Sequence, residues 1–119
     1  MTVIFAERVL SDMASAQCRE DAKGAVVTVT GEIDMISAPD LADLLSALLP
    51  ESRKTLVVDL TRTSFFGVSG LAVLVEIRQA VKDRGAGLRI LSRSRHTRGY
   101  LCLAGLASAD DQALDGAAS

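Results

Sequence analysis

The side chains best placed to do chemistry in this sequence are Asp34, Ser37 and Ser69, which stand at predicted boundaries between strands and helices. A serine at a helix start can accept a hydrogen bond from a free backbone N–H of the first turn and so act as the N-cap. The same hydroxyl can instead be presented to a partner kinase as a phosphate acceptor. For Ser69 both readings stay open, with capping the commoner role. Asp34 either closes a turn or makes a charged contact.

Enzymatic chemistry has no visible apparatus in the sequence. Ser69 lies in Gly67-Val68-Ser69-Gly70, which is one residue short of the Gly-x-Ser-x-Gly elbow of serine hydrolases. No glycine-rich loop ends in Lys-Ser or Lys-Thr, as nucleotide hydrolysis would require. His96 is the sole histidine, so a second one for a metal site or a proton relay is missing, and its arginine-rich surroundings favour a solvated helix start. We therefore expect no catalytic residue, no metal and no cofactor.

The two cysteines, Cys18 and Cys102, are far apart in the sequence and fit neither a metal-binding nor a thioredoxin-type spacing. Cys18 falls on the inward side of a predicted strand, whereas Cys102 falls on the outer face of a predicted helix. An accessible Cys102 is a candidate redox thiol, although an inert thiol is the commoner case.

Composition excludes several classes of partner. The chain has 119 residues, enough for one domain with a sizeable core, and 49% of them are hydrophobic. Aromatic residues make up 3% and the net charge is −2, so the chain lacks both the stacking platforms and the positive field that nucleic acids require. The opening apolar run over residues 3–6 is too short for a membrane span or a signal-peptide core. We expect a cytoplasmic protein.

The apolar patterning predicts one α/β domain over residues 14–107. Residues 1–13 precede it as an arm that is poorly ordered or forms a short docking helix, and residues 108–119 follow as a small acidic tail. Strands are expected at residues 14–20, 25–30, 55–60 and 88–91, and helices at 37–48, 69–84 and 94–105.

The order strand, helix, strand occurs twice, and such crossovers imply parallel neighbouring strands. Both crossovers leave the carboxyl ends of their strands at the same edge of the sheet, where partners usually dock. Asp34 and Ser69 are therefore expected to lie close together. On the helix over residues 69–84, the helical spacing leaves Ala72 and Val75 on the outer face as a small apolar patch and a candidate partner footprint.

Four segments in this order resemble the sulfate transporter and anti-sigma-factor antagonist (STAS) family. They are Val26 to Asp34, Val57 to Leu60, Ser64 to Leu71, and Ala104-Gly105-Leu106. The resemblance implies a four- to five-stranded mixed sheet with helices packed mainly on one face. It also implies a function: an anti-sigma factor antagonist, which binds an anti-sigma factor, usually a kinase-like protein, and so frees a sigma factor for transcription.

The sequence departs from the family at the position of its phosphorylated serine. In similar proteins that serine lies in Asp-Ser-Ser/Thr-Gly, and here these positions fall on Gly67, Val68, Ser69 and Gly70. Val68 has no hydroxyl, so we expect the phosphoserine switch to be missing, with Ser69 a displaced acceptor at best.

The predicted partner-binding residues lie at the edge of the sheet and along the start of the second helix. They are Asp34, Ser37, Gly67, Val68, Ser69, Gly70, Ala72 and Val75. The alternative is a STAS-like scaffold, or a subunit of a transporter or signalling assembly that binds a small anion. The sequence leaves the oligomeric state open.

Overall fold

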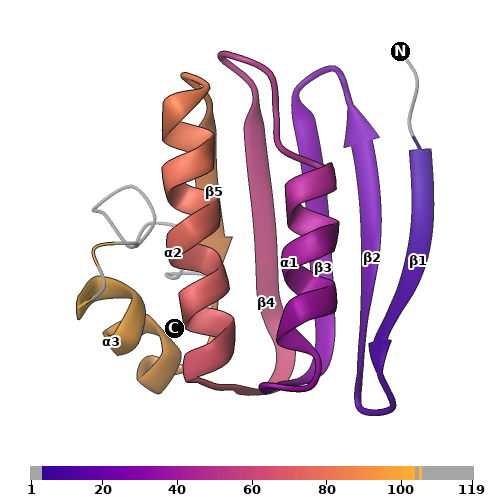
Figure 1. Cartoon of the computed structure of the whole chain (residues 1–119), viewed down its shortest axis with the longest axis vertical. Coiled ribbons are helices and arrows are strands. Elements are labelled where there is room, and N and C mark those ends of the chain that lie inside the picture. The colour runs from indigo at the N-terminus through magenta and orange to yellow at the C-terminus, as the bar shows by residue number, and fades with distance from the viewer. Residues whose placement is uncertain (1–3, 104, 106–119) are drawn as a thin grey trace.

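The computed structural model of the protein describes residues 4–103 and 105, which form a five-stranded sheet and three helices (Figure 1). The sheet has the order β1-β2-β3-β4-β5. The strands are β1 (Ile4–Ser11), β2 (Ala14–Asp21), β3 (Gly24–Ile33), β4 (Thr55–Phe66) and β5 (Gly87–Leu91), and the helices are α1 (Ala38–Ala47), α2 (Val68–Asp83) and α3 (Arg95–Leu103).

The sheet is mixed, as predicted. Strands β1, β2 and β3 pair antiparallel, whereas β3, β4 and β5 pair parallel through crossovers that contain α1 and α2. Figure 1 shows α1 and α2 side by side across one face of the sheet, with α3 beside the start of α2. The predicted α/β class, with helices mainly on one face, is confirmed.

The core lies between this face of the sheet and the two helices. On β4, Leu56, Val58 and Leu60 alternate inward and are almost completely buried, because successive strand residues point to opposite faces. On α2, the predicted inward stripe is also buried, including Leu74 and Ile77. The apolar side chains on one face of β4 therefore pack against the apolar side chains on the inner face of α2.

The prediction of an arm or docking helix over residues 1–13 is wrong for residues 4–11, which form β1 and pair with β2. Strand β1 lies at the edge of the sheet, where the side chains of Ala6 to Val9 are exposed and Leu10 is buried. Over residues 6–11, Leu10 is the only buried side chain, so this segment lacks the apolar alternation by which strands are recognised. The predicted tail over residues 108–119 lies outside the described residues.

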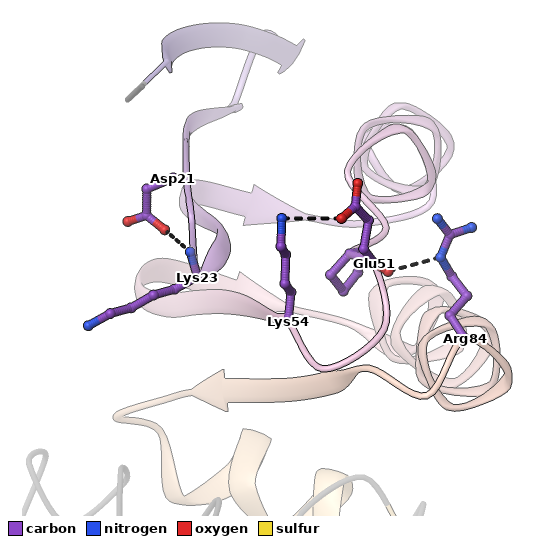
Figure 2. A network of polar contacts seen from close by, with 6 residues as sticks. Asp21, Lys23, Glu51, Lys54 and Arg84 are labelled. Atoms are coloured by element: carbon purple, nitrogen blue, oxygen red, sulfur yellow. Dashed lines mark hydrogen bonds and ion pairs between the residues drawn. The ribbon is translucent and has the colours of Figure 1, made fainter. Parts of the chain in front are cut away.

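The end of the sheet opposite the predicted site is closed by polar contacts (Figure 2). Lys54 Nζ lies 3.2 Å from the Glu51 carboxylate, Arg84 Nε donates to the Pro50 carbonyl at 2.9 Å, and the Asp21 carboxylate accepts the Lys23 N–H at 2.8 Å. These contacts fix the turns that precede β3, β4 and β5.

Over the described part of the chain, no helix is long and apolar enough to cross a membrane.

Candidate functional site

The carboxyl ends of β3 and β4 meet at one edge of the sheet, at the lower end of Figure 1. The last residues of the two strands, Ile33 and Phe66, are register partners, and the Gly67 N–H donates to the Ile33 carbonyl at 2.9 Å. This bond ties the joint between β4 and α2 to the loop between β3 and α1. The structure therefore brings together the two segments that the sequence predicted as neighbours.

Asp34 and Ser37 hold each other in a closed turn. The Asp34 carboxylate accepts the backbone N–H groups of Ile36 at 2.9 Å and Ser37 at 3.1 Å, and the Ser37 hydroxyl at 3.2 Å. In return, Ser37 Oγ accepts the Asp34 N–H at 2.9 Å. The Ser37 and Ile36 N–H groups stabilise the charged carboxylate and lower the pKa of Asp34 below its ordinary value.

Ser37 is fully buried, so its hydroxyl supports this loop from within. It occupies the N-cap position of α1, as predicted, but its side chain makes no capping bond to the helix. Met35 and Ile36, between the two polar residues, point outward and are 78% and 75% exposed. The turn therefore presents two large apolar side chains at the edge of the sheet.

The N-cap of α2 lies two residues earlier in the chain than expected. Gly67 takes the N-cap position and Val68 is the first helical residue, so the reading of Ser69 as the N-cap is wrong. Ser69 is partly exposed in the first turn, and its role as a phosphate acceptor stays a prediction. Val68 is 74% exposed, and the first turn contains no acidic residue. The first residue of α2 thus presents an exposed apolar side chain.

Two glycines let this helix start approach the sheet closely. A Cβ atom at Gly70 would lie 2.8 Å from the Cγ2 atom of Ile33 and 2.8 Å from the ring of Phe66, so only a glycine fits without displacement. A Cβ atom at Gly67 would lie 2.9 Å from the ring of Phe65. The Phe65 ring thus occupies the space beside Gly67.

Large apolar side chains are exposed along this end of the molecule. We call five of them the apolar rim: Met35, Ile36, Phe65, Val68 and Val75. Val75 and Ala72 are exposed on the outer face of α2, which confirms the predicted patch.

Sequence reasoning missed Met35, Ile36 and Phe65. A signal for the first two was present, because consecutive large apolar residues between Asp34 and Ser37 lie in a tight turn and cannot both face a core. The sequence held no such signal for Phe65. Strand β4 extends to Phe66, beyond the predicted strand end at Leu60, and Phe65 is exposed on this unpredicted extension.

A cavity of about 380 Å³ opens beside the rim, between the end of β4, the start of α2 and the start of α3. His96 and Tyr100 line it, with their rings edge to face and the centroids 5.3 Å apart. The predicted N-cap of α3 is confirmed, because Ser94 Oγ accepts the Thr97 N–H at 3.2 Å. His96 is exposed on this first turn, as predicted.

The two cysteines are not bridged; Cys18 is buried and Cys102 is exposed, as predicted. Burial raises the pKa of the Cys18 thiol. A redox role of Cys102 stays a prediction. Within residues 4–103 and 105, no group of three or more histidine, cysteine or acidic side chains is arranged to hold a metal ion.

Comparison with known proteins identifies the family. The model of the STAS domain matches residues 13–110. The chain is 33% identical over 82 residues to the anti-sigma-F factor antagonist RsfB of Mycobacterium tuberculosis, over 69% of this chain and 66% of RsfB. The match therefore spans slightly less than two thirds of that relative's length.

Solved structures of anti-sigma factor antagonists have a similar fold. An anti-sigma factor antagonist from Mycobacterium paratuberculosis superposes with a TM-score of 0.69 at 30% identity, covering 84% of this chain and 91% of that one. The phosphorylated form of the Bacillus cell fate determinant SpoIIAA superposes with a TM-score of 0.61 at 16% identity, covering 96% of this chain and 99% of that one, and this likeness concerns the fold alone. Since the family model covers most of the chain and the fold agrees with these structures, the chain belongs to the STAS domain family.

Proposed function

We propose that this protein is an anti-sigma factor antagonist without catalytic activity, which binds an anti-sigma factor and thereby frees a sigma factor for transcription. Support comes from the family and from relatives that are themselves named as anti-sigma factor antagonists. The resemblance further suggests a kinase-like partner. Because sigma factors act on RNA polymerase, the proposal places the protein in the cytoplasm.

The docking surface in this proposal is the apolar rim together with Asp34, Ser69 and Ala72. Ser37, Gly67 and Gly70 hold the backbone beneath this surface in place. Exposed apolar side chains that gather at one end of a small domain are typical of protein–protein interfaces. Complete burial of a valine or methionine contributes about 1.5–3 kcal/mol, so a few rim residues would supply much of a micromolar affinity.

The observation that carries the regulatory part of the proposal is Val68, 74% exposed at the first position of α2. A phosphoserine there would add a charge of about −1.5 to −2 to the docking surface. Valine has no oxygen to accept a phosphoryl group. The partner's kinase activity, where it has one, would therefore leave the antagonist active.

Docking is tested by pull-down of the anti-sigma factor with wild type, Val68→Asp and Val68→Ala. The aspartate places a negative charge where the rim is apolar, and we expect it to weaken binding about tenfold or more, and Val68→Ala to weaken it less. Unfolding cannot explain such a loss, because an acidic residue in the first turn of a helix stabilises it by about 0.3–1 kcal/mol. Equal binding of wild type and Val68→Asp would contradict the proposed surface.

The missing switch is tested separately, by incubation with the partner kinase and ATP and measurement of intact mass. We expect wild type to stay unmodified and Val68→Ser to gain one phosphate. A stoichiometric phosphate on wild type that disappears in Ser69→Ala would show that the acceptor has moved by one residue, and would refute the loss of the switch.

A further inference from the structure

The cavity between β4, α2 and α3 has the features of a small-molecule site. At about 380 Å³ it falls within the range of roughly 300–1,000 Å³ that is usual for ligand pockets. Its walls include the rings of Phe65, Phe66 and Tyr100. Aromatic walls favour a flat ring, because ring pairs in offset or edge-to-face geometry gain about 0.5–1.5 kcal/mol beyond area burial.

The polar groups of the cavity favour an anion over a cation. The described residues that line it include no acidic side chain. His96 and the hydroxyl-bearing Ser64 are among them. Arg93 and Arg95 are exposed next to the lining residues Ser94 and His96. The sequence next to the cavity is thus basic, although the chain as a whole carries a net charge of −2.

From the aromatic walls, the polar lining without acidic side chains and the basic sequence beside it, we propose that this cavity is a binding site for a small aromatic carboxylate. The ring lies between Phe65, Phe66 and Tyr100, and the carboxylate points toward His96. The cavity shares Phe65 and Val68 with the docking surface of the proposed antagonist function, but its occupancy can be measured on the chain alone.

The composition of the chain makes the test specific. The sequence contains one tyrosine and one histidine, and both line the cavity, so each gives a single set of side-chain signals in an aromatic NMR spectrum that reports on this place. The probe is 2-naphthoate. With about 13 non-hydrogen atoms at roughly −0.3 kcal/mol each, it should bind at about −4 kcal/mol, a Kd of about 1 mM.

We expect 2-naphthoate to shift the Tyr100 and His96 signals saturably. Two matched probes separate the contributions: 2-naphthalenemethanol keeps the rings without the charge, and cyclohexanecarboxylate keeps the charge without an aromatic ring. Each should bind about fivefold to tenfold more weakly. Equal affinities for all three probes, or shifts that rise linearly without saturation, would overturn the proposal.

Variants locate the binding. We expect Tyr100→Ala, read by the His96 signals, and His96→Ala, read by the Tyr100 signals, to weaken 2-naphthoate about fivefold or more. Both side chains are exposed, so neither change should unfold the domain. Leu103→Ala, a change at an 88% exposed residue of the same helix outside the cavity, is the control and should bind like wild type. Unchanged affinity in both cavity variants would refute the site.

Two other occupants would show themselves in the same spectra. Shifts of the Tyr100 and His96 signals on dilution, without any probe, would assign the cavity to a second copy of the chain. Binding of 2-naphthoate only after deletion of residues 106–119 would assign it to the chain's own C-terminal segment. Either result would overturn the proposal of a small aromatic ligand.

Discussion

Three neighbouring residues together change the chemistry of the helix start. Gly67 has no side chain and Val68 has no hydroxyl, while the Phe65 ring would lie 2.9 Å from a Cβ atom at position 67. Phe65 and Val68 remain 52% and 74% exposed. The three residues thus make the helix start apolar, and in the proposed function this start would be recognised through shape and burial.

The turn between β3 and α1 depends on a charged carboxylate at Asp34, and this gives a pH-dependent prediction. The N–H donors of Ile36 and Ser37 surround the carboxylate only in the folded state, so the pKa of Asp34 is lower in the folded than in the unfolded chain. Between the two pKa values the unfolded chain binds more protons, and stability therefore rises with pH. The contribution is complete above the unfolded pKa of about 3.9 and is lost as the pH falls through the folded pKa.

We expect Asp34→Asn to be less stable than wild type near neutral pH, with a difference in free energy of unfolding that shrinks as the pH falls below about 4. Urea denaturation at a series of pH values between 3 and 7 measures this difference. Parallel stability curves for the two proteins over the whole range would show that the carboxylate charge is not what holds the turn.

Strands and helices with one buried and one exposed face were predicted correctly, whereas the edge strand and the start of one helix were not. A β-branched run predicted β3 and a nearly continuous apolar run predicted β4. The helical period of 3.6 predicted the buried faces of α1 and α2, because each helix buries one side. The edge strand β1, where the side chains of residues 6–9 are exposed, was missed. The start of α2 was misplaced because Ser69 is a good N-cap by type.

Gly70 packs closely against the ends of β3 and β4. A Cβ atom there would lie 2.8 Å from Ile33 and 2.8 Å from the ring of Phe66, and Gly70 is buried in the first turn of α2. No local propensity records a contact between residues that are 37 positions apart in the chain, as Gly70 and Ile33 are. This tertiary contact therefore could not be predicted from the local sequence pattern.

The contact yields a prediction for Gly70→Ala. Alanine is favoured over glycine in a helix by about 1 kcal/mol, but overpacking a buried site costs about 1–3 kcal/mol. Ile33 is fully buried and cannot move aside easily, so we expect the clash to win and the domain to lose about 1 kcal/mol. Urea denaturation measures the loss, and Ser69→Ala, in the same turn but partly exposed, should stay within about 0.5 kcal/mol of wild type. A stabilised Gly70→Ala protein would contradict the close packing.

Across the whole molecule, the two ends of the sheet differ in character. One end is closed by the polar contacts of Figure 2, whereas the other exposes the apolar rim and the cavity beside it. Parallel strands separate the two ends in this way, because all their connections to the following helices leave from the carboxyl edge. The sequence predicted a candidate site at the carboxyl edge of the sheet. The exposed apolar side chains at that edge, above all Met35 and Ile36, were recognised only in the structure of the turn.

This polarity predicts that binding and stability respond independently to surface changes. In the double variant Met35→Ser/Ile36→Ser, two exposed side chains are replaced, so the free energy of unfolding should change by no more than about 0.5 kcal/mol for each. If both side chains are buried by the anti-sigma factor, the affinity should fall about 10-fold to 100-fold. Titration calorimetry against the anti-sigma factor measures this change.

Two controls separate the rim from general effects. Leu103→Ser removes an apolar side chain that is 88% exposed on α3 but lies outside the rim, and Glu51→Gln/Lys54→Gln removes the ion pair at the opposite end. An exposed ion pair contributes about 0–1 kcal/mol to stability, and its loss at the far end should leave affinity unchanged. If Leu103→Ser weakens binding as much as the Met35→Ser/Ile36→Ser variant, the partner responds to exposed apolar surface in general, and the rim loses its special role.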